Sequence, residues 1–263
     1  MKIDTLFIHG GPGLHCTVER AWFGDTLPVL WWDQPALLPS ATEVTPPFRT
    51  LVAHVGRQLA AMAKSNGNAV DLIANSFGGQ IAAALAREYP ALIRHITLLG
   101  CSPDPIRQFF LLARRLLDAG FEHPGLRDAL AAAEENCDES RFFALVQACY
   151  PNGALPDIYF GPNSTAARER YFAIAAPPMD ATTFFLVMQE LLHTPPATQV
   201  IPYGGEVTIL MGRHDPLLDV VVDQEKWRSI LPQAEFRTVN TGHAVHFELS
   251  PEAWCNRRSG WMP

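Results

Sequence analysis

The sequence predicts an α/β protein: a mostly parallel sheet of about six strands with helices on both faces. Two observations carry this prediction. Short apolar runs alternate with helical segments in residues 1–103 and again in residues 203–263. Successive parallel strands need such crossover helices, and burial on both faces makes them continuously apolar. Residues 104–202 show helical patterns without a clear strand, which indicates a helical insertion between the two halves of the core.

The core elements follow from where apolar runs and helical periodicity begin and end. The expected strands are residues 6–8, 29–32, 70–74, 96–99, 207–211 and 236–239. Core helices are expected over residues 51–62, 77–89 and 220–230, with a last one starting near residue 251. Ser65-Asn66-Gly67 ends the first of these helices, and Pro90 ends the second.

The insertion is predicted as a set of helices separated by proline-rich joints. The expected helices are residues 106–117, 126–135, 140–148, 165–175 and 182–192. Their apolar stripes suit docking on the core, and they also suit an apolar pocket for an acyl group. Phe109 and Phe110 are candidates for that pocket.

Composition excludes several classes of function. The chain has 263 residues, 48% of them hydrophobic, which suits a globular protein with a sizeable core. Its 27 acidic and 20 basic residues argue against nucleic acid as the main partner. It has no run of about 18 apolar residues, so no membrane span is expected. Without a signal-peptide layout or metal-type cysteine spacing, we expect a cytoplasmic protein with reduced thiols and no metal.

Ser76 is the central candidate for chemistry. It follows the strand at residues 70–74 and precedes a helix, so a strained turn would present its side chain at the tip of the strand. Small residues must stand two positions before and after such a nucleophile, and Ala74 and Gly78 do so. The helix that follows directs its N-terminus at the site and favours negative charge there. Alone, the pattern also fits an ordinary helix N-cap.

A glycine-rich loop follows the first strand and suggests an oxyanion hole. His9-Gly10-Gly11-Pro12-Gly13 can turn backbone N–H groups toward a bound carbonyl. Gly11 is the expected first donor, because glycine tolerates unusual backbone angles. Phe77, directly after the serine, is the expected second donor.

Two later strands end at the remaining groups that an activated serine needs. Asp215 follows the strand at residues 207–211, and His243 follows the strand at residues 236–239. A histidine can take the serine proton near neutral pH, and a carboxylate fixes its tautomer. The order serine, aspartate, histidine is the one that this architecture uses.

With these motifs in place, the chain resembles the α/β-hydrolase superfamily over nearly all of the core. His9-Gly10-Gly11-Pro12-Gly13 resembles the oxyanion loop of the proline iminopeptidase-like branch, and Asp33-Gln34 resembles the start of its Asp-Gln-Arg-Gly turn. Here Pro35 and Ala36 replace the arginine and glycine, and Ala74 replaces the usual elbow glycine. The resemblance implies that the chain begins at the family's third strand, which leaves about six strands. It also implies a helical cap over residues 104–202.

Several other residues compete for roles at the site. Asp104 is the rival acid, because some family members place it after the preceding strand. His246 is expected to pack with Phe247, and Asp219 and Asp223 are expected to be solvated helix acids. Candidates for the pocket wall, besides the two phenylalanines, are His9, Gly10, Cys16 and Cys101. Glu134 and Glu135 can bind a substrate amine by resemblance to aminopeptidases, although a solvated helix end is the simpler interpretation.

The sequence therefore predicts a cofactor-free serine hydrolase. Its substrate would be a small ester, thioester, lactone or amide with an apolar part, cleaved through an acyl intermediate on Ser76. Three alternatives stay open: a proline iminopeptidase-type aminopeptidase, a non-catalytic binding protein on the same fold, and a lyase or carbon–carbon bond hydrolase with the same triad. An exposed strand edge also makes a homodimer an expectation.

Overall fold

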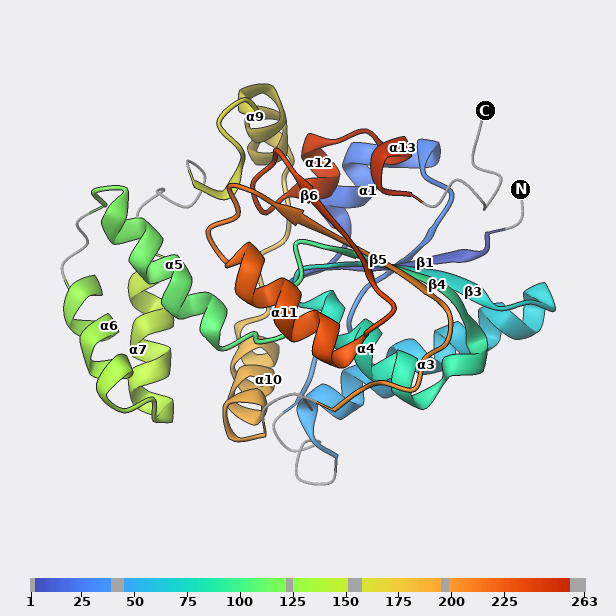
Figure 1. Ribbon diagram of the computed structural model, residues 1–263, viewed down its shortest axis with the longest axis horizontal. Coiled ribbons are helices and arrows are strands. Elements are labelled where there is room, and N and C mark those ends of the chain that lie inside the picture. The colour runs from blue at the N-terminus through green and yellow to red at the C-terminus, as the bar shows by residue number, and fades with distance from the viewer. Residues whose placement is uncertain (1–2, 39–44, 122–124, 151–157, 195–198, 256–263) are drawn as a thin grey trace.

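The protein contains one six-stranded sheet in which all strands are parallel (Figure 1). The computed structural model describes residues 3–38, 45–121, 125–150, 158–194 and 199–255. The strands are β1 (Thr5–Ile8), β2 (Leu30–Trp32), β3 (Val70–Asn75), β4 (Ile93–Leu99), β5 (Glu206–Gly212) and β6 (Glu235–Val239). Their order across the sheet is β2-β1-β3-β4-β5-β6, which confirms the predicted fold class and strand number.

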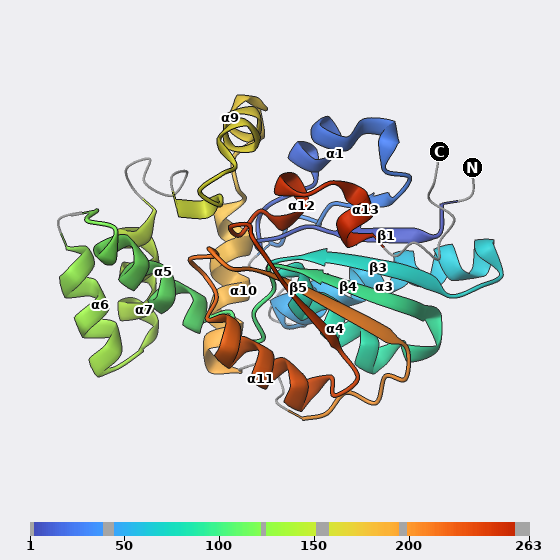
Figure 2. The same ribbon diagram turned by 45° about the horizontal axis from the view of Figure 1, so that its top comes forward.

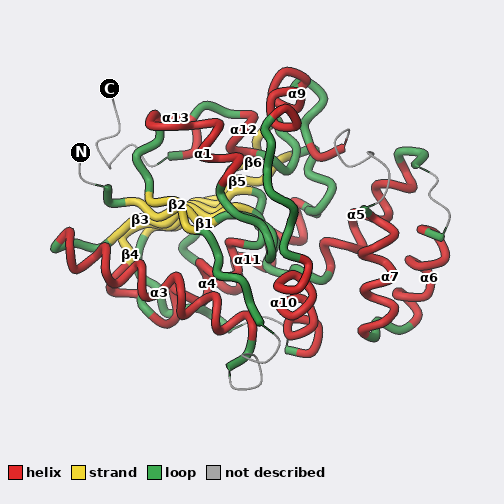
Figure 3. Tube along the Cα trace, turned by 180° about the vertical axis from the view of Figure 1, so that it is seen from behind, coloured by secondary structure: helices red, strands yellow, loops and turns green. Residues whose placement is uncertain are grey.

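Helices cover both faces of the sheet (Figures 2 and 3). One face carries α3 (Pro47–Asn66), α4 (Gly78–Glu88) and α11 (Val220–Ile230). The other carries the shorter α1 (Thr17–Phe23), α12 (Val245–Glu248) and α13 (Pro251–Trp254). Two short 3₁₀ helices, η1 (Gly24–Thr26) and η2 (Pro90–Leu92), complete the core. None of the helices in the described ranges is long and apolar enough to cross a membrane.

Alternation along the strands explains why two layers of helices are needed. Leu72 and Ala74 pack into the core cluster under α3, α4 and α11, whereas Ile73 packs into the cluster under α1, α12 and α13. Successive side chains of a strand point to opposite faces, so an apolar strand requires cover on both sides. Trp31 and Trp32 divide between the two clusters in the same way.

The register of the sheet brings the carboxyl ends of the central strands together. Ile8 of β1 pairs with Ala74 of β3, and Asn75 at the end of β3 pairs with Leu99 at the end of β4. The loops that leave β1, β3, β4 and β5 therefore start at one edge of the sheet. In open parallel sheets this edge is where ligands bind.

The residues between β4 and β5 form the helical insertion. It contains α5 (Arg107–Asp118), α6 (Leu126–Glu135), α7 (Glu139–Cys149), α9 (Thr165–Ala173) and α10 (Ala181–His193), and no strand among its described residues. Figure 1 shows α5, α6 and α7 packed together beside the sheet, while α9 and α10 lie closer to the core. These helices match the predicted ones to within two residues at each end.

Helix α10 forms hydrogen bonds with the core along its length. At its start, the Asp180 N–H donates to the Gly13 carbonyl at 2.8 Å. The Leu37 N–H donates to the Thr183 hydroxyl at 3.0 Å, and the Phe48 N–H donates to the carboxylate of Glu190 at 2.6 Å. Since Gly13 belongs to the loop after β1, the insertion directly contacts the segment expected to form the oxyanion hole.

Candidate active site

Ser76 occupies the turn between β3 and α4 in a strained backbone conformation. Its φ is +50°, and it is the only non-glycine residue with positive φ in the described part of the chain. Such a conformation costs free energy in a residue with a Cβ, and the surroundings must impose it. The Leu99 carbonyl at the end of β4 accepts hydrogen bonds from the Ser76 N–H at 2.9 Å and from the Asn75 side-chain amide at 3.0 Å.

Close backbone packing explains the two glycines after the serine. A Cβ on Gly78 would lie 2.7 Å from the carbonyl oxygens of Ile8 and His9, and a Cβ on Gly79 would lie 2.7 Å from the Cys101 side chain. Only glycine lets α4 start this close to the end of β1. The turn is therefore pressed against the loop that carries the expected oxyanion donors.

Three of the predicted residues form a continuous chain of hydrogen bonds. The distance between His243 Nε2 and Ser76 Oγ is 2.9 Å. The distance between His243 Nδ1 and Asp215 Oδ2 is 2.8 Å. The three groups come from loops after β3, β5 and β6, so the sheet register brings together residues far apart in the sequence.

The surroundings hold the aspartate and the histidine in place. The Asp215 side chain is fully buried, and its second oxygen accepts a hydrogen bond from the Leu217 N–H at 2.8 Å. The His243 N–H donates to the Tyr159 carbonyl at 2.8 Å, and the Tyr159 ring packs edge-on against the imidazole at 4.7 Å. Gly100, with φ +61°, leaves room here: a Cβ would lie 2.8 Å from the His243 carbonyl.

Glu248 supports the same loop, and the sequence analysis missed it. Its carboxylate accepts hydrogen bonds from the N–H of Gly242 and the N–H of Gly161, both at 2.9 Å, and from the Ser164 hydroxyl. Burial raises the pKa of this carboxyl above its ordinary value. Glu248 thus links the residue before His243 to the insertion. In the sequence, the only indication of this role is that an acid ends the segment 241–248 around His243.

The loop after β1 lies against Ser76, as predicted. A Cβ on Gly10 would lie 3.0 Å from the Ser76 Cβ, and Gly11 adopts a φ of +57°. Within the described part of the chain, the N–H groups of Gly11 and Phe77 donate no hydrogen bond. Two unused backbone donors next to a serine hydroxyl suit the stabilisation of an oxyanion.

A cavity of about 330 Å³ opens in front of Ser76 and His243. Of the predicted pocket residues, His9, Gly10 and Phe109 line it, together with Gly11 and Phe77. The insertion contributes much of the rest of the wall through Pro105, Gln108, Phe109, Tyr150, Tyr159, Tyr171, Phe172, Ala176, Pro177, Met179, Phe184 and Met188.

The other three predicted pocket residues lie elsewhere. The Cys16 thiol donates to the Trp32 carbonyl at 3.1 Å, and Cys101 lies fully buried behind Gly79. Phe110 packs, partly buried, against the main core. None of the three is among the described residues of the cavity wall. Burial raises the pKa of Cys101 to about 12, so its thiol stays protonated at neutral pH.

The competing acids have other partners. Asp104 bonds Lys226 Nζ at 2.8 Å and accepts from the Arg107 N–H at 3.0 Å. Asp219 is the N-cap of α11 rather than a residue inside the helix, and its side chain is partly exposed. The expectation that Asp223 is solvated is wrong: its side chain is fully buried and bonds Arg107 Nη1 at 3.1 Å. A buried carboxylate of this kind is tolerated only with such partners.

The remaining candidate residues also find structural roles. His246 packs on Phe247 with a ring distance of 4.0 Å, as predicted. Glu134 pairs with Arg114, and Glu135 pairs with a second arginine, on exposed helix surfaces. Neither glutamate is among the described residues of the cavity wall. In the described ranges, no three His, Cys, Asp or Glu side chains are grouped as metal ligands would be.

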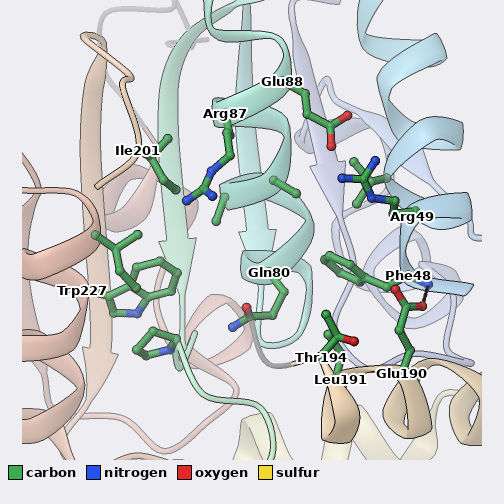
Figure 4. Close-up of a pocket in the computed structure, with 15 residues that line it drawn as sticks. Phe48, Arg49, Gln80, Arg87, Glu88, Glu190, Leu191, Thr194, Ile201 and Trp227 are labelled. Carbon is green, nitrogen blue, oxygen red and sulfur yellow. Dashed lines mark hydrogen bonds between the residues drawn. The ribbon is translucent and has the colours of Figure 1, made fainter. Parts of the chain in front are cut away.

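A second cavity, of about 260 Å³, is lined by residues near the end of α10 together with α3, α4 and α11 (Figure 4). Figure 4 shows Phe48 and Arg49 from α3, Gln80 from α4 and Trp227 from α11 around it. Its described wall includes none of the three hydrogen-bonded groups above. The two cavities share no residue of their described walls, and only the first contains the serine.

Comparison with known proteins identifies the family. Residues 6–249 match the family described as alpha/beta hydrolase fold. The chain belongs to this family. No curated protein has a sequence that matches this chain.

Solved structures agree on the fold. The proline iminopeptidase-related protein from Thermus thermophilus is 22% identical with a TM-score of 0.63, covering 96% of this chain and 86% of that one. A thermophilic esterase from Thermogutta terrifontis is 20% identical with a TM-score of 0.58, covering 98% and 89%. MenH from S. aureus is 18% identical with a TM-score of 0.59, covering 99% and 93%. At these identities the likeness shows the fold, and the family makes a hydrolase the expected class of enzyme.

Proposed function

We propose that this α/β hydrolase is a cofactor-free serine hydrolase that cleaves a small ester, thioester, lactone or amide. One observation carries the proposal: Ser76, on its strained turn, bonds His243 at 2.9 Å, and His243 bonds the buried Asp215 at 2.8 Å. A serine hydroxyl is a poor nucleophile unless an adjacent base takes its proton, and this chain of hydrogen bonds supplies that base.

The catalytic cycle assigns one role to each group. Ser76 Oγ attacks the carbonyl carbon while His243 Nε2 takes its proton. Asp215 keeps the Nδ1–H tautomer in place and stabilises the imidazolium that forms. His243 then gives the proton to the leaving group, and water releases the acyl group by the reverse path.

The oxyanion is proposed to rest on the N–H groups of Gly11 and Phe77. Both donors are free for a ligand in the described part of the chain, and both line the cavity beside Ser76. Each such donor contributes about 3 kcal/mol of transition-state stabilisation. The start of α4 adds its dipole to the same place.

The helical insertion is proposed to act as a cap, residues 104–202, over a core of residues 1–103 and 203–263. Its side chains form much of the cavity wall, so it shapes the space for the substrate and excludes water from it. The aromatic and aliphatic side chains among them, such as Phe109 and Phe184, suit a substrate with an apolar part.

Turnover of a substrate panel tests this proposal. We expect the purified protein to hydrolyse at least one of p-nitrophenyl acetate, p-nitrophenyl butyrate, a thioester and a lactone without added metal or cofactor. The matched variant Ser76→Ala should lose this activity while keeping its fold by circular dichroism. Activity that survives in Ser76→Ala would refute the assignment of the nucleophile.

A further inference from the structure

The cavity in front of Ser76 has two chemically different ends. At one end, Phe109 packs edge-on against Tyr150 and Phe184, with ring distances of 6.3 and 6.2 Å. At the other end, α1 and α12 bring Glu19 and His246 within 3.6 Å of each other. All five residues line the cavity. The first end suits an apolar group, and the second end is polar.

Glu19 at the polar end is a buried carboxylate without a hydrogen-bond donor. The residue is 7% exposed, and His246 Nε2 lies 3.6 Å from its Oε1. That separation is too long for a good hydrogen bond. No donor among the described residues bonds the Glu19 carboxylate. Burying a charge is costly unless it is paired and hydrogen-bonded, so this carboxylate requires a partner.

The described part of the cavity wall does not supply a lysine or arginine for it. Among the described residues that line the cavity, Glu19 is the sole carboxylate, and there is no lysine or arginine. Arg20, the next residue in the chain, instead pairs with Asp33. The pKa of His9 is lowered by burial, so that imidazole is neutral at pH 7. The end of the cavity next to Glu19 therefore favours a cation.

Two histidine rings that line the same cavity offer further acceptors for a hydrogen-bond donor of a ligand. The ring nitrogens of His15 and His246 are buried and have no hydrogen-bond partner among the described residues. A neutral imidazole has one acceptor nitrogen. An ammonium group carries its N–H donors in several directions, so it can serve a carboxylate and an imidazole acceptor together.

We propose that Glu19 binds a protonated amine of the substrate, while an apolar group of the same molecule occupies the end lined by Phe109 and Phe184. This inference rests on the proposed function, which it deepens: the substrate class becomes an amine-bearing ester or amide with an apolar part. Glu19 is a specificity residue in this scheme, because it contacts the substrate away from the reacting carbonyl.

Equilibrium binding to the Ser76→Ala variant tests the amine site without requiring turnover. Two probes differ in one group: 4-phenylbutylamine and 4-phenylbutan-1-ol. Calorimetry should show the amine binding about tenfold tighter than the alcohol, as expected for a charge-assisted hydrogen bond in a buried site.

Two second-site variants show which end binds which group. In Glu19→Gln, the preference for the amine over the alcohol should disappear. In Phe109→Ala, both probes should weaken by the same factor, and the preference should remain. Glu225→Gln, which removes an exposed acid of α11 outside the cavity wall, should behave like the parent. Thermal unfolding of each variant establishes that it is folded.

The outcomes separate this inference from the proposed function. Equal affinity for amine and alcohol in the Ser76→Ala parent, or an amine preference that survives in Glu19→Gln, overturns the amine site. An amine preference that depends on Glu19 in a protein whose serine fails to react would support the site and refute the hydrolase assignment.

Discussion

The candidate catalytic residues can be predicted because each of them lies just after the end of a strand. The sequence predicts Ser76, His243 and Asp215 because each follows an apolar run, and the structure places them in one chain of hydrogen bonds. Sequence reasoning could not find Glu248 or the burial of Asp223. Both depend on contacts between segments far apart in the chain, such as Glu248 with Gly161.

Removing the charge of Asp215 tests the assignment of the acid. We expect Asp215→Asn to lower kcat by about 10⁴-fold, because an amide at this position favours the wrong histidine tautomer. The rival acid provides the control: Asp104→Asn, which removes only the charge paired with Lys226, should leave kcat within about threefold. A larger loss of kcat in Asp104→Asn than in Asp215→Asn would contradict the assignment.

Burial of His9 predicts a stability that depends on pH. Its pKa in the folded protein is lowered from 6.5, mainly by desolvation. As the pH falls through about 6.5, the unfolded chain takes up a proton that the folded chain does not, so the free energy of unfolding decreases. Urea titrations between about pH 7.5 and pH 5.5 should show this decrease.

The variant His9→Gln isolates that contribution. The loss of stability on acidification should be smaller in the variant, although a residual loss should remain because the pKa values of His54 and His95 are lowered too. An unchanged pH dependence in His9→Gln would show that His9 does not account for the effect.

At the scale of elements, predictions were good wherever periodicity decides the structure. All six strands and the long helices lie where apolar runs and helical spacing indicate. The short helices α1 and α12 were not predicted, because seven and four residues give too little periodicity to detect. Tertiary packing stabilises them: Phe23 of α1 stacks on Phe247 of α12 at 6.0 Å.

Glycines at the strand ends let the loops of the site pack closely against one another. Substitution of Gly212 tests this packing. A Cβ there would lie 2.0 Å from the Gly242 carbonyl, so Gly212→Ala must move the loop of His243 away from that of Asp215. We expect at least about a hundredfold loss of kcat/KM, since small displacements of a catalytic group cost that much. Gly204→Ala, where a Cβ meets nothing within 4 Å, should retain activity. Equal activities in the two variants would contradict the packing described.

At the scale of the whole molecule, a buried ionic network joins the insertion to the core. Asp223 of α11 accepts from the Ser102 hydroxyl at 2.9 Å and from Arg107, the first residue of α5. Together with the bonds of α10 to Gly13 and Phe48, this network fixes the insertion over the cavity. The sequence shows that an insertion exists, but periodicity contains no information about where it attaches.

Breaking that network should destabilise the fold. Arg107 pairs with Asp219 and Asp223, so Asp223→Ala removes one of its two carboxylate partners. We expect a loss of about 3 kcal/mol in the free energy of unfolding. Glu225→Ala, at an exposed position of the same helix, should change it by less than about 0.5 kcal/mol. Chemical denaturation measures both, and similar values for the two variants would argue against a structural role for the network.

Covalent labelling tests most directly whether Ser76 is an activated nucleophile. The protein is treated with a fluorophosphonate, and its intact mass is measured beside Ser76→Ala and His243→Ala. We expect one adduct on the parent, located at Ser76 by peptide mapping. Ser76→Ala should form no adduct, and labelling of His243→Ala should be strongly slowed. A folded parent that stays unlabelled, or an adduct at another residue, would contradict this expectation.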